Sequence, residues 1–183
     1  MSKENADKEQ KRSFKREVFS WIACIVVTIL LTEFILNFVI INANIPSGSM
    51  ENTIMTNDKL IALRTSYWFN DPKRGDIIIF KYPDDETEWF IKRVIALPGE
   101  TVLVKDGKVY INASKKALSE PYIKEEPVED FGPYKVPKNG YFVMGDNRNN
   151  SNDAREWETH YVSRDEVLGK AWFRYYPSIK VIK

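Results

Sequence analysis

One long apolar run near the N-terminus limits what this chain can fold into more than any other feature. From Val18 to Ile41 the sequence is almost wholly apolar, and a helix needs about 20 such residues to cross a bilayer. Glu33 interrupts the run and is costly inside a membrane unless it faces a partner or a thin, watery part of the bilayer. The pattern predicts a single transmembrane helix over residues 18–41.

The sequence before this run predicts the orientation of the helix. Residues 1–17 form a solvated tail in which Lys and Arg outnumber Asp and Glu. Because basic residues gather on the cytoplasmic side, we expect this tail in the cytoplasm and residues 42–183 on the far side. A cleaved signal peptide is the alternative. The run is long for one, and no clean small-x-small cleavage site follows it, so an uncleaved anchor is favoured.

Composition excludes several function classes. With 27 basic and 26 acidic residues the net charge is +1, so nothing points to nucleic acid as a partner. Cys24 is the only cysteine and His160 the only histidine, which rules out an internal disulfide and leaves no basis for a metal centre. No cofactor is expected. Catalysis would have to use Ser, Lys, Asp, Glu, Arg or His160.

Short apolar runs separated by turn residues predict a mostly β domain of antiparallel strands over residues 42–183. The expected strands are 59–64, 75–80, 88–97, 101–104, 108–112, 140–144 and 168–176. The run Gly75–Phe80 is continuously apolar, so its strand should be covered on both faces. Asp106-Gly107 predicts a tight hairpin. Residues 101–139 form a smaller inserted β segment, in which 113–139 is an excursion with little core.

A turn directly after the apolar run carries two serines. In Pro46-Ser47-Gly48-Ser49-Met50, Pro46 fixes one backbone angle and Gly48 permits a sharp turn. That geometry can present the Ser49 hydroxyl to a substrate. On its own, such a stretch is more often a plain polar turn.

A lysine in the expected strand 88–97 can serve as a base. Side chains alternate along a strand, so Lys92 shares its face with Phe90 and Val94, while Arg93 points the other way. Burial can lower a lysine pKa by up to about 3–5 units from its usual value near 10.4. Such a lysine can take the proton of a serine hydroxyl. The alternative is that Lys92 reaches out to solvent from a half-exposed strand.

Four motifs follow the anchor in a fixed order. They are PSGSM at 46–50, GDIIIF at 75–80, KRVIALPG at 92–99 and GDNRNNSNDAR at 145–155. With these motifs, the chain from the anchor onward resembles the bacterial type I signal peptidases, membrane-bound serine proteases that remove signal peptides from exported proteins. Each motif is weak alone, but four in order are specific.

The resemblance implies a Ser-Lys dyad. Ser49 matches the nucleophile and Lys92 the general base. Ser47 matches the residue whose hydroxyl joins the Ser49 backbone N–H in the oxyanion hole, where one donor can be worth about 3–4 kcal/mol.

The last motif supplies the expected supporting residues. Ser151 matches the serine that hydrogen-bonds the lysine and orients it, and Asp153 and Arg155 match an ion pair beneath the site. Three positions depart from the family pattern, which more often has proline, serine and glycine there: Asn52, Ala154 and Ala96. None removes a catalytic group, but they put efficiency and loop geometry in doubt.

The resemblance also implies the fold and the partners. The expected fold is an all-β catalytic domain of several antiparallel sheets behind one anchor, the compact form typical of Gram-positive bacteria. Expected partners are the lipid bilayer and signal peptides with small residues at the −1 and −3 positions, which an edge strand could pair with. A contact with the secretion machinery is left open, and no nucleic acid is expected. The aromatic pairs Trp68-Phe69 and Trp172-Phe173 suit either the headgroup level or packing within the domain.

Other functions fit the sequence less well. A Ser-His-Asp hydrolase would use His160. The self-cleaving repressors of the SOS response use the same dyad but carry a DNA-binding segment where this chain has an apolar helix. A membrane-tethered assembly factor on an inactive peptidase scaffold would be expected to lack Ser49 or Lys92, and both are present.

Overall fold

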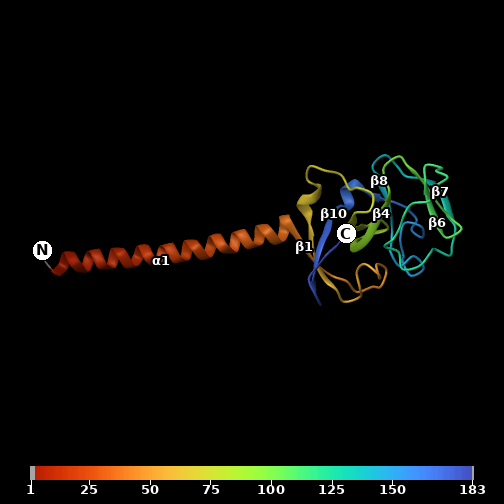
Figure 1. Cartoon of the computed structure of the whole chain (residues 1–183). Helices are drawn as coiled ribbons and strands as arrows, with labels where there is room; N and C mark the ends of the chain where they lie inside the picture. Colours follow the sequence, from red (N-terminus) through yellow and green to blue (C-terminus); the bar gives the residue numbers. More distant parts are fainter. Residues whose placement is uncertain (1–2, 183) are drawn as a thin grey trace. The chain divides into compact units, whose positions relative to one another are not determined.

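The computed structural model of the chain describes residues 3–182 and has two units (Figure 1). The first unit extends to Val39 and is helical, and the second begins at Ile40 and is built from strands.

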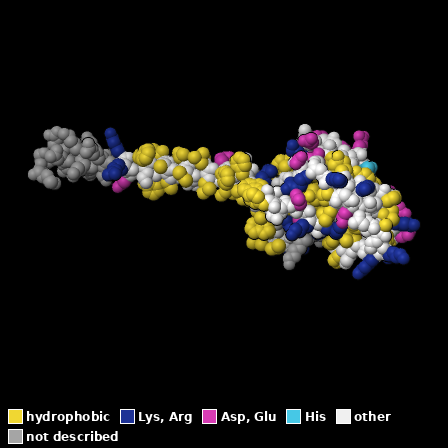
Figure 2. Space-filling model, turned by 90° about the horizontal axis from the view of Figure 1, so that it is seen from above, with side chains coloured by type: hydrophobic (Ala, Val, Ile, Leu, Met, Phe, Trp, Pro, Cys, Tyr) yellow, Lys and Arg dark blue, Asp and Glu magenta, His cyan; other side chains and the backbone are white. Residues whose placement is uncertain are grey.

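The first unit is one long helix. Helix α1 (Lys3–Phe34) continues into the π-helical turn η1 (Ile35–Val39). The stretch Phe14–Val39 is long and apolar enough to cross a membrane: its 18-residue apolar window has a mean hydropathy of 2.4 and no residue buried within the protein. Hydrophobic side chains accordingly lie on its surface (Figure 2). The predicted single apolar helix is therefore present.

Glu33, which interrupts the apolar part of this stretch, has a partner one turn along the helix. The Asn37 side-chain amide donates to Glu33 Oε2 at 3.1 Å and to the Glu33 backbone oxygen at 2.8 Å. Hydrogen bonding lowers the cost of a polar side chain in an apolar medium.

The boundaries of the helix differ from the expected ones at both ends. The helix begins at Lys3, so most of the predicted tail over residues 1–17 is helical, and residues 1 and 2 lie outside the described part. At the other end the helix stops at Val39, because Ile40 and Ile41 belong to the first strand. Apolar residues suit a membrane helix and a buried strand equally, so the sequence run does not show this boundary.

Over residues 40–182, the described part of the second unit, there are eleven strands, β1 to β11. They are β1 (Ile40–Asn44), β2 (Lys59–Leu63), β3 (Ile77–Tyr82), β4 (Asp85–Ala96), β5 (Thr101–Lys105), β6 (Lys108–Ile111), β7 (Phe131–Lys135), β8 (Gly140–Met144), β9 (Val162–Ser163), β10 (Val167–Tyr176) and β11 (Lys180–Val181). Two short 3₁₀ helices join them, η2 (Arg64–Tyr67) and η3 (Arg164–Glu166).

The strands form a large sheet and a small one. The large sheet has the order β1-β2-β10-β3-β4-β8-β9, with β11 also paired to β10, and the small sheet has the order β6-β5-β7. Every pair is antiparallel. Within this unit, β6 and β7 of the small sheet lie at the opposite end from β1 (Figure 1). The predicted fold class, an apolar helix followed by antiparallel β sheets with a smaller β excursion, is confirmed.

Strand β3 is covered on both faces, as its continuous apolar sequence predicts. Ile78 and Phe80 belong to one buried cluster, and Ile77 and Ile79 to the other. Strand β4 pairs with β3 so that Ile78 lies opposite Lys92. A strand that is buried on both faces therefore fixes the position of this lysine.

Other local predictions can be compared directly with the structure. The Asp106-Gly107 hairpin is present between β5 and β6, with φ angles of 50° and 75°. The excursion 113–139 contains one strand that the sequence does not predict, β7. Its sequence Phe-Gly-Pro-Tyr-Lys includes Gly and Pro, which normally weaken a strand and are tolerated mainly at edges, and β7 lies at the edge of the small sheet.

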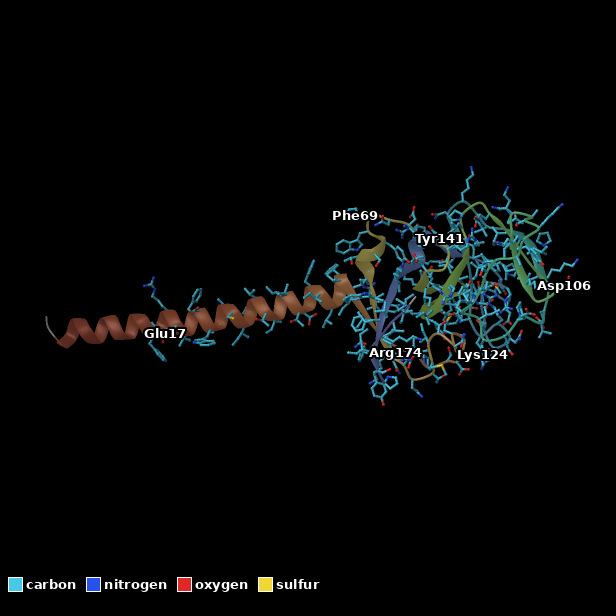
Figure 3. All side chains as sticks on the ribbon, viewed as in Figure 1. Glu17, Phe69, Asp106, Lys124, Tyr141 and Arg174 are labelled. Atoms are coloured by element: carbon cyan, nitrogen blue, oxygen red, sulfur yellow. The ribbon has the colours of Figure 1, made fainter. Side chains whose placement is uncertain are left out.

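The two faces of β3 lead to a prediction about stability. We expect Phe80→Ala to lower the free energy of unfolding by about 3–5 kcal/mol, because Phe80 is fully buried and its removal leaves a cavity. Phe69→Ala is the matched control, since Phe69 is 89% exposed on a surface loop (Figure 3) and should change stability by less than about 0.5 kcal/mol. Chemical denaturation of the full chain in detergent measures both. Equal losses would contradict this packing.

Candidate active site

The turn between β1 and β2 is fixed at both ends and in its middle. The backbone of Ile45 pairs with Asp58 and Asn57, which closes the turn into a loop. Met50, directly after Ser49, is fully buried in the apolar cluster beneath. Ser49 is thereby held at the surface of that cluster, with 6% of its area exposed.

Strand β4 brings Lys92 to this serine. The Lys92 Nζ atom lies 2.7 Å from Ser49 Oγ, and only 4% of the lysine is exposed. Burial lowers the pKa of Lys92 to about 8, the nearby Asp153 carboxylate opposes this, and the Arg155 guanidinium adds to it. A lysine whose pKa is close to neutral pH, and whose amine contacts a serine hydroxyl, is suited to remove the hydroxyl proton.

The second serine of the turn lies close to the first. Ser47 Oγ is 3.4 Å from Ser49 Oγ. Its hydroxyl is therefore near the position where a carbonyl carbon would be attacked.

The loop after β8 packs directly on the turn. Asn147 donates its backbone N–H to the Ser49 carbonyl at 3.1 Å and its side-chain amide to the Gly48 carbonyl at 3.0 Å. A Cβ atom on Gly145 would collide with both the Ser49 carbonyl oxygen and Ser151 Oγ. Only glycine fits there, so this loop and the turn are in van der Waals contact.

A buried ion pair supports this loop from within. Arg155 donates two hydrogen bonds to the Asp153 carboxylate, at 2.8 and 2.9 Å, and Asp153 also accepts the Gly145 backbone N–H at 3.0 Å. Asp153 is fully buried. The pair that the sequence suggested is thus formed next to Lys92, whose pKa it influences.

Ser151 is placed differently from the expectation. Its hydroxyl is buried and has no hydrogen-bond partner among the described residues, rather than bonding to Lys92. Ser151 still lines a surface cleft together with Ser49 and Lys92.

Sequence reasoning missed a second buried ion pair, on the other face of β4. The Arg93 guanidinium donates to both oxygens of Asp146, at 2.8 and 2.7 Å, and to the Gly75 carbonyl at 2.8 Å. Thr53 donates to the same carboxylate at 2.5 Å. The signal was present, since Arg93 and Asp146 lie in two of the four motifs. The alternation of side chains along β4 predicts that Arg93 faces away from Lys92, but it does not identify Asp146 as the partner of Arg93.

His160 contacts other groups. Its Nδ1 atom is 2.8 Å from the Ala154 carbonyl oxygen, and its ring packs edge-on against Phe131 and Tyr134. This packing argues against a role for His160 as the base for Ser49, which Lys92 contacts instead.

The three departures from the family pattern have local explanations. Asn52 has a φ of 89°, which proline cannot adopt because its ring holds φ near −65°. Ala154 and Ala96 are fully buried in the core, where a small side chain fits.

A cleft of about 830 Å³ is lined by Ser47, Ser49, Lys92 and Ser151. Its volume is within the range usual for ligand sites. The edge strand β1 and the segment Glu88–Lys92 of β4 form parts of its wall, together with residues 149–152. The described residues contain no group of three or more His, Cys, Asp or Glu side chains that could hold a metal.

Comparisons with known proteins agree on one family. The profile of the family described as signal peptidase, peptidase S26, matches residues 18–176. The chain is similar to signal peptidase I of Leptolyngbya laminosa, with 44% identity over 164 residues, covering 85% of this chain and 78% of the relative. It is 34% identical to signal peptidase I of Bacillus amyloliquefaciens over 185 residues, covering 96% and 97%. A crystal structure of a signal peptidase I from Enterococcus faecalis is 35% identical, covers 55% of this chain and 97% of that one, and has a TM-score of 0.48.

Burial of Lys92 predicts that the site costs stability. Its pKa falls from 10.5 to about 8 on folding, so the folded state is penalised fully below pH 8, and the penalty disappears as pH rises from 8 to 10.5. We expect Lys92→Met to raise the free energy of unfolding at pH 7 by about 1–3 kcal/mol. Denaturation at pH 7 and pH 10.5 measures the gain. Lys81→Met, on the exposed part of β3, is the control and should change little. A variant equally destabilised at both pH values would contradict the argument.

Proposed function

Because this chain belongs to the signal peptidase family, peptidase S26, we propose that Ser49 is the nucleophile of its reaction and Lys92 the general base. Family membership makes the protein a membrane-bound serine endopeptidase that removes signal peptides from exported preproteins. The observation that carries the residue assignment is the 2.7 Å distance between Ser49 Oγ and Lys92 Nζ in a buried site.

In the first half of the reaction, the neutral Lys92 amine accepts the Ser49 hydroxyl proton while Oγ attacks the carbonyl carbon of the scissile bond. The tetrahedral intermediate collapses when the Lys92 ammonium gives its proton to the leaving amine. That amine is the new N-terminus of the mature protein. The signal peptide remains attached to Ser49 as an ester.

In the second half, Lys92 takes a proton from a water molecule, and the resulting nucleophile attacks the ester. Lys92 then returns the proton to Ser49 Oγ, and the signal peptide leaves with a carboxylate. One base with a pKa of about 8 can serve both halves, because it is readily charged and discharged near neutral pH.

The negative charge that develops on the carbonyl oxygen needs donors in place before the reaction. We assign this role to the Ser49 backbone N–H and the Ser47 hydroxyl. The 3.4 Å separation of the Ser47 and Ser49 oxygens supports the second donor.

Three residues of the loop after β8 complete the proposed site. Asp153 and Arg155 hold the loop through their buried ion pair. Ser151 has a buried hydroxyl that meets no hydrogen-bond partner within the described part of the chain, and we propose that it accepts a hydrogen bond from Lys92 once the amine carries an additional proton.

The cleft suits an extended peptide. Strand β1 is at the edge of the large sheet, and its residues Asn42–Asn44 line the cleft opposite β4. A signal peptide can pair with this edge by strand addition. Side chains two residues apart on a strand point the same way, so those at −1 and −3 both face the cleft floor. Ile79 and Ile91 line the same cleft, and their branched side chains favour small substrate residues there.

The arrangement across the membrane follows from charge. We propose a basic tail over residues 1–17 in the cytoplasm, an anchor from residue 18 that ends near Val39 or Ile41, and an extracytoplasmic domain that includes the insert 101–139. The excess of Lys and Arg in the tail supports this orientation. Signal peptides and the bilayer are then its partners, and a contact with the secretion machinery is compatible with this placement.

Removing either member of the dyad should abolish cleavage. We expect Ser49→Ala and Lys92→Ala to lower kcat by at least about 10⁴-fold on a fluorogenic signal-peptide substrate with an Ala-x-Ala site. Ser114→Ala and Lys81→Ala, which change exposed residues of the same types, should keep wild-type activity. His160→Ala should also remain active. Activity lost with His160→Ala in a folded protein, but kept with Lys92→Ala, would favour the Ser-His-Asp alternative. A wild type that cuts nothing would favour the scaffold alternative.

The dyad also predicts a pH dependence. Only the neutral form of Lys92 can accept a proton, and its pKa is lowered to about 8. We expect kcat/KM to rise about tenfold per pH unit below pH 8 and to level off above it. Initial rates between pH 5.5 and 10, with the melting temperature checked at each pH, provide the measurement. A profile that levels off near pH 6.5 would indicate a histidine base.

A further inference from the structure

One short segment far from the catalytic motifs in sequence contacts all three stretches that carry the proposed catalytic residues. Residues 120–124, named here the crossing segment, lie in the connection between β6 and β7. The three stretches are the turn after Ser49, the strand position after Lys92 and the loop before Ser151.

The first contact is with the turn that presents the nucleophile. The Asn52 side-chain amide donates to the Tyr122 carbonyl at 2.9 Å and to the Ile123 carbonyl at 3.2 Å. Lys124, labelled in Figure 3, pairs with Glu51 at 2.8 Å. Asn52 has a positive φ, so the crossing segment holds a turn residue in the backbone conformation that closes the Ser49 turn.

The second contact is with the ion pair behind β4. The Tyr122 ring lies over the Arg93 guanidinium, 3.9 Å from ring centroid to Cζ. The Lys124 backbone N–H donates to the Asp146 carbonyl at 3.0 Å. The segment thus covers Arg93, which follows Lys92 on β4, and Asp146, the carboxylate partner of Arg93.

The third contact is a buried ion pair that fixes the loop after β8. Arg148 donates to both oxygens of Glu120, at 3.0 and 2.6 Å, with 0% and 6% of the two side chains exposed. Tyr122 Oη donates to the same carboxylate at 3.0 Å. Bidentate pairs of this type set orientation as well as charge balance.

Arg148 links the Glu120 carboxylate to the backbone beside the proposed reacting groups. Its Nε donates to the Gly145 carbonyl at 3.0 Å, and its own carbonyl accepts Arg155 at 2.5 Å. Gly145 is packed against both Ser49 and Ser151, with no room for a Cβ. A displacement of Arg148 would therefore displace the backbone that touches both serines.

We propose that Glu120 is a positioning residue for the peptidase reaction, which acts by holding the Arg148 guanidinium and, through it, the Gly145 backbone against Ser49. The inference rests on the proposed function, in which Ser49 and Lys92 form the dyad. A surface pair would have little effect. Here both charges are buried, and loss of the carboxylate leaves a guanidinium that must move toward water.

The test compares Glu120→Gln with Glu125→Gln, a matched change of an exposed glutamate just beyond the crossing segment. Full-length proteins in detergent are assayed for kcat, KM, the pH dependence of kcat/KM and melting temperature. For Glu120→Gln we expect kcat to fall about 10- to 100-fold, more than KM changes. The acid limb of the pH profile should move to higher pH, because a displaced loop admits water to Lys92. Glu125→Gln should match wild type.

Two further variants keep the test decisive if Glu120→Gln folds poorly. Glu120→Asp keeps the charge and should recover part of the lost kcat. The double variant Glu120→Leu with Arg148→Met removes both charges together, a replacement that often preserves stability, yet it should keep the low kcat because the Gly145 carbonyl then loses its hydrogen bond from Arg148. Wild-type kcat and an unchanged acid limb in folded Glu120→Gln or in the double variant would overturn the proposal.

A Ser49→Ala arm separates this inference from the proposed dyad. If Ser49→Ala remains active, the dyad assignment fails, whatever the Glu120 variants do. If Ser49→Ala is inactive while folded Glu120→Gln has the wild-type kcat and pH profile, only the positioning role of Glu120 fails.

Discussion

The burial of Lys92 against Ser49 is the constraint on which the rest of the site depends. A lysine without water is poorly stabilised as a cation, so its pKa falls to about 8. That environment must be kept dry by the strand on which Lys92 lies and by the loop packed over it. Strand β3, apolar on both faces, supplies a rigid neighbour for β4. The chemistry of one amine thus explains why the most continuously apolar strand lies beside it.

The same strand carries a buried arginine. A buried guanidinium needs a carboxylate partner, and Arg93 has one in Asp146, whereas an unpaired carboxylate beside Lys92 would favour its charged form. Alternation along β4 sends the two cations to opposite faces. Asp146 is bound by Arg93 on one face, and Asp153 near Lys92 is bound by Arg155. The Asp153 carboxylate raises the pKa of Lys92 and the Arg155 guanidinium lowers it, so Arg155 keeps more of the amine neutral as well as holding the loop.

The parts of this structure that the sequence predicts are those determined by local pattern. The strand period assigns Lys92 and Arg93 to their faces, and Asp106-Gly107 specifies its hairpin. The sequence does not predict strand β1, because Ile40 and Ile41 suit a membrane helix as well as a strand. The sequence predicts only an excursion with little core where the crossing segment lies, since the contacts of this segment with the site join residues 22 to 73 positions apart. The unpaired hydroxyl of Ser151 depends on side-chain placement within the loop, which no spacing rule gives.

The crossing segment supplies stabilising interactions that the buried site itself lacks. The contact between Ser49 and Lys92 joins one hydroxyl to one amine and adds little attraction to hold the parts of the site together, and burial of Lys92 lowers stability near neutral pH. The serine turn, β4 and the loop after β8 are separated in sequence, and next to Ser49 they meet at small contacts such as Gly145 against the Ser49 carbonyl. Strong, directional interactions are therefore placed one layer away, where charge does not disturb the lysine. The Glu120–Arg148 pair is of this kind: it is bidentate and buried, and it reaches Ser49 through the backbone of Gly145.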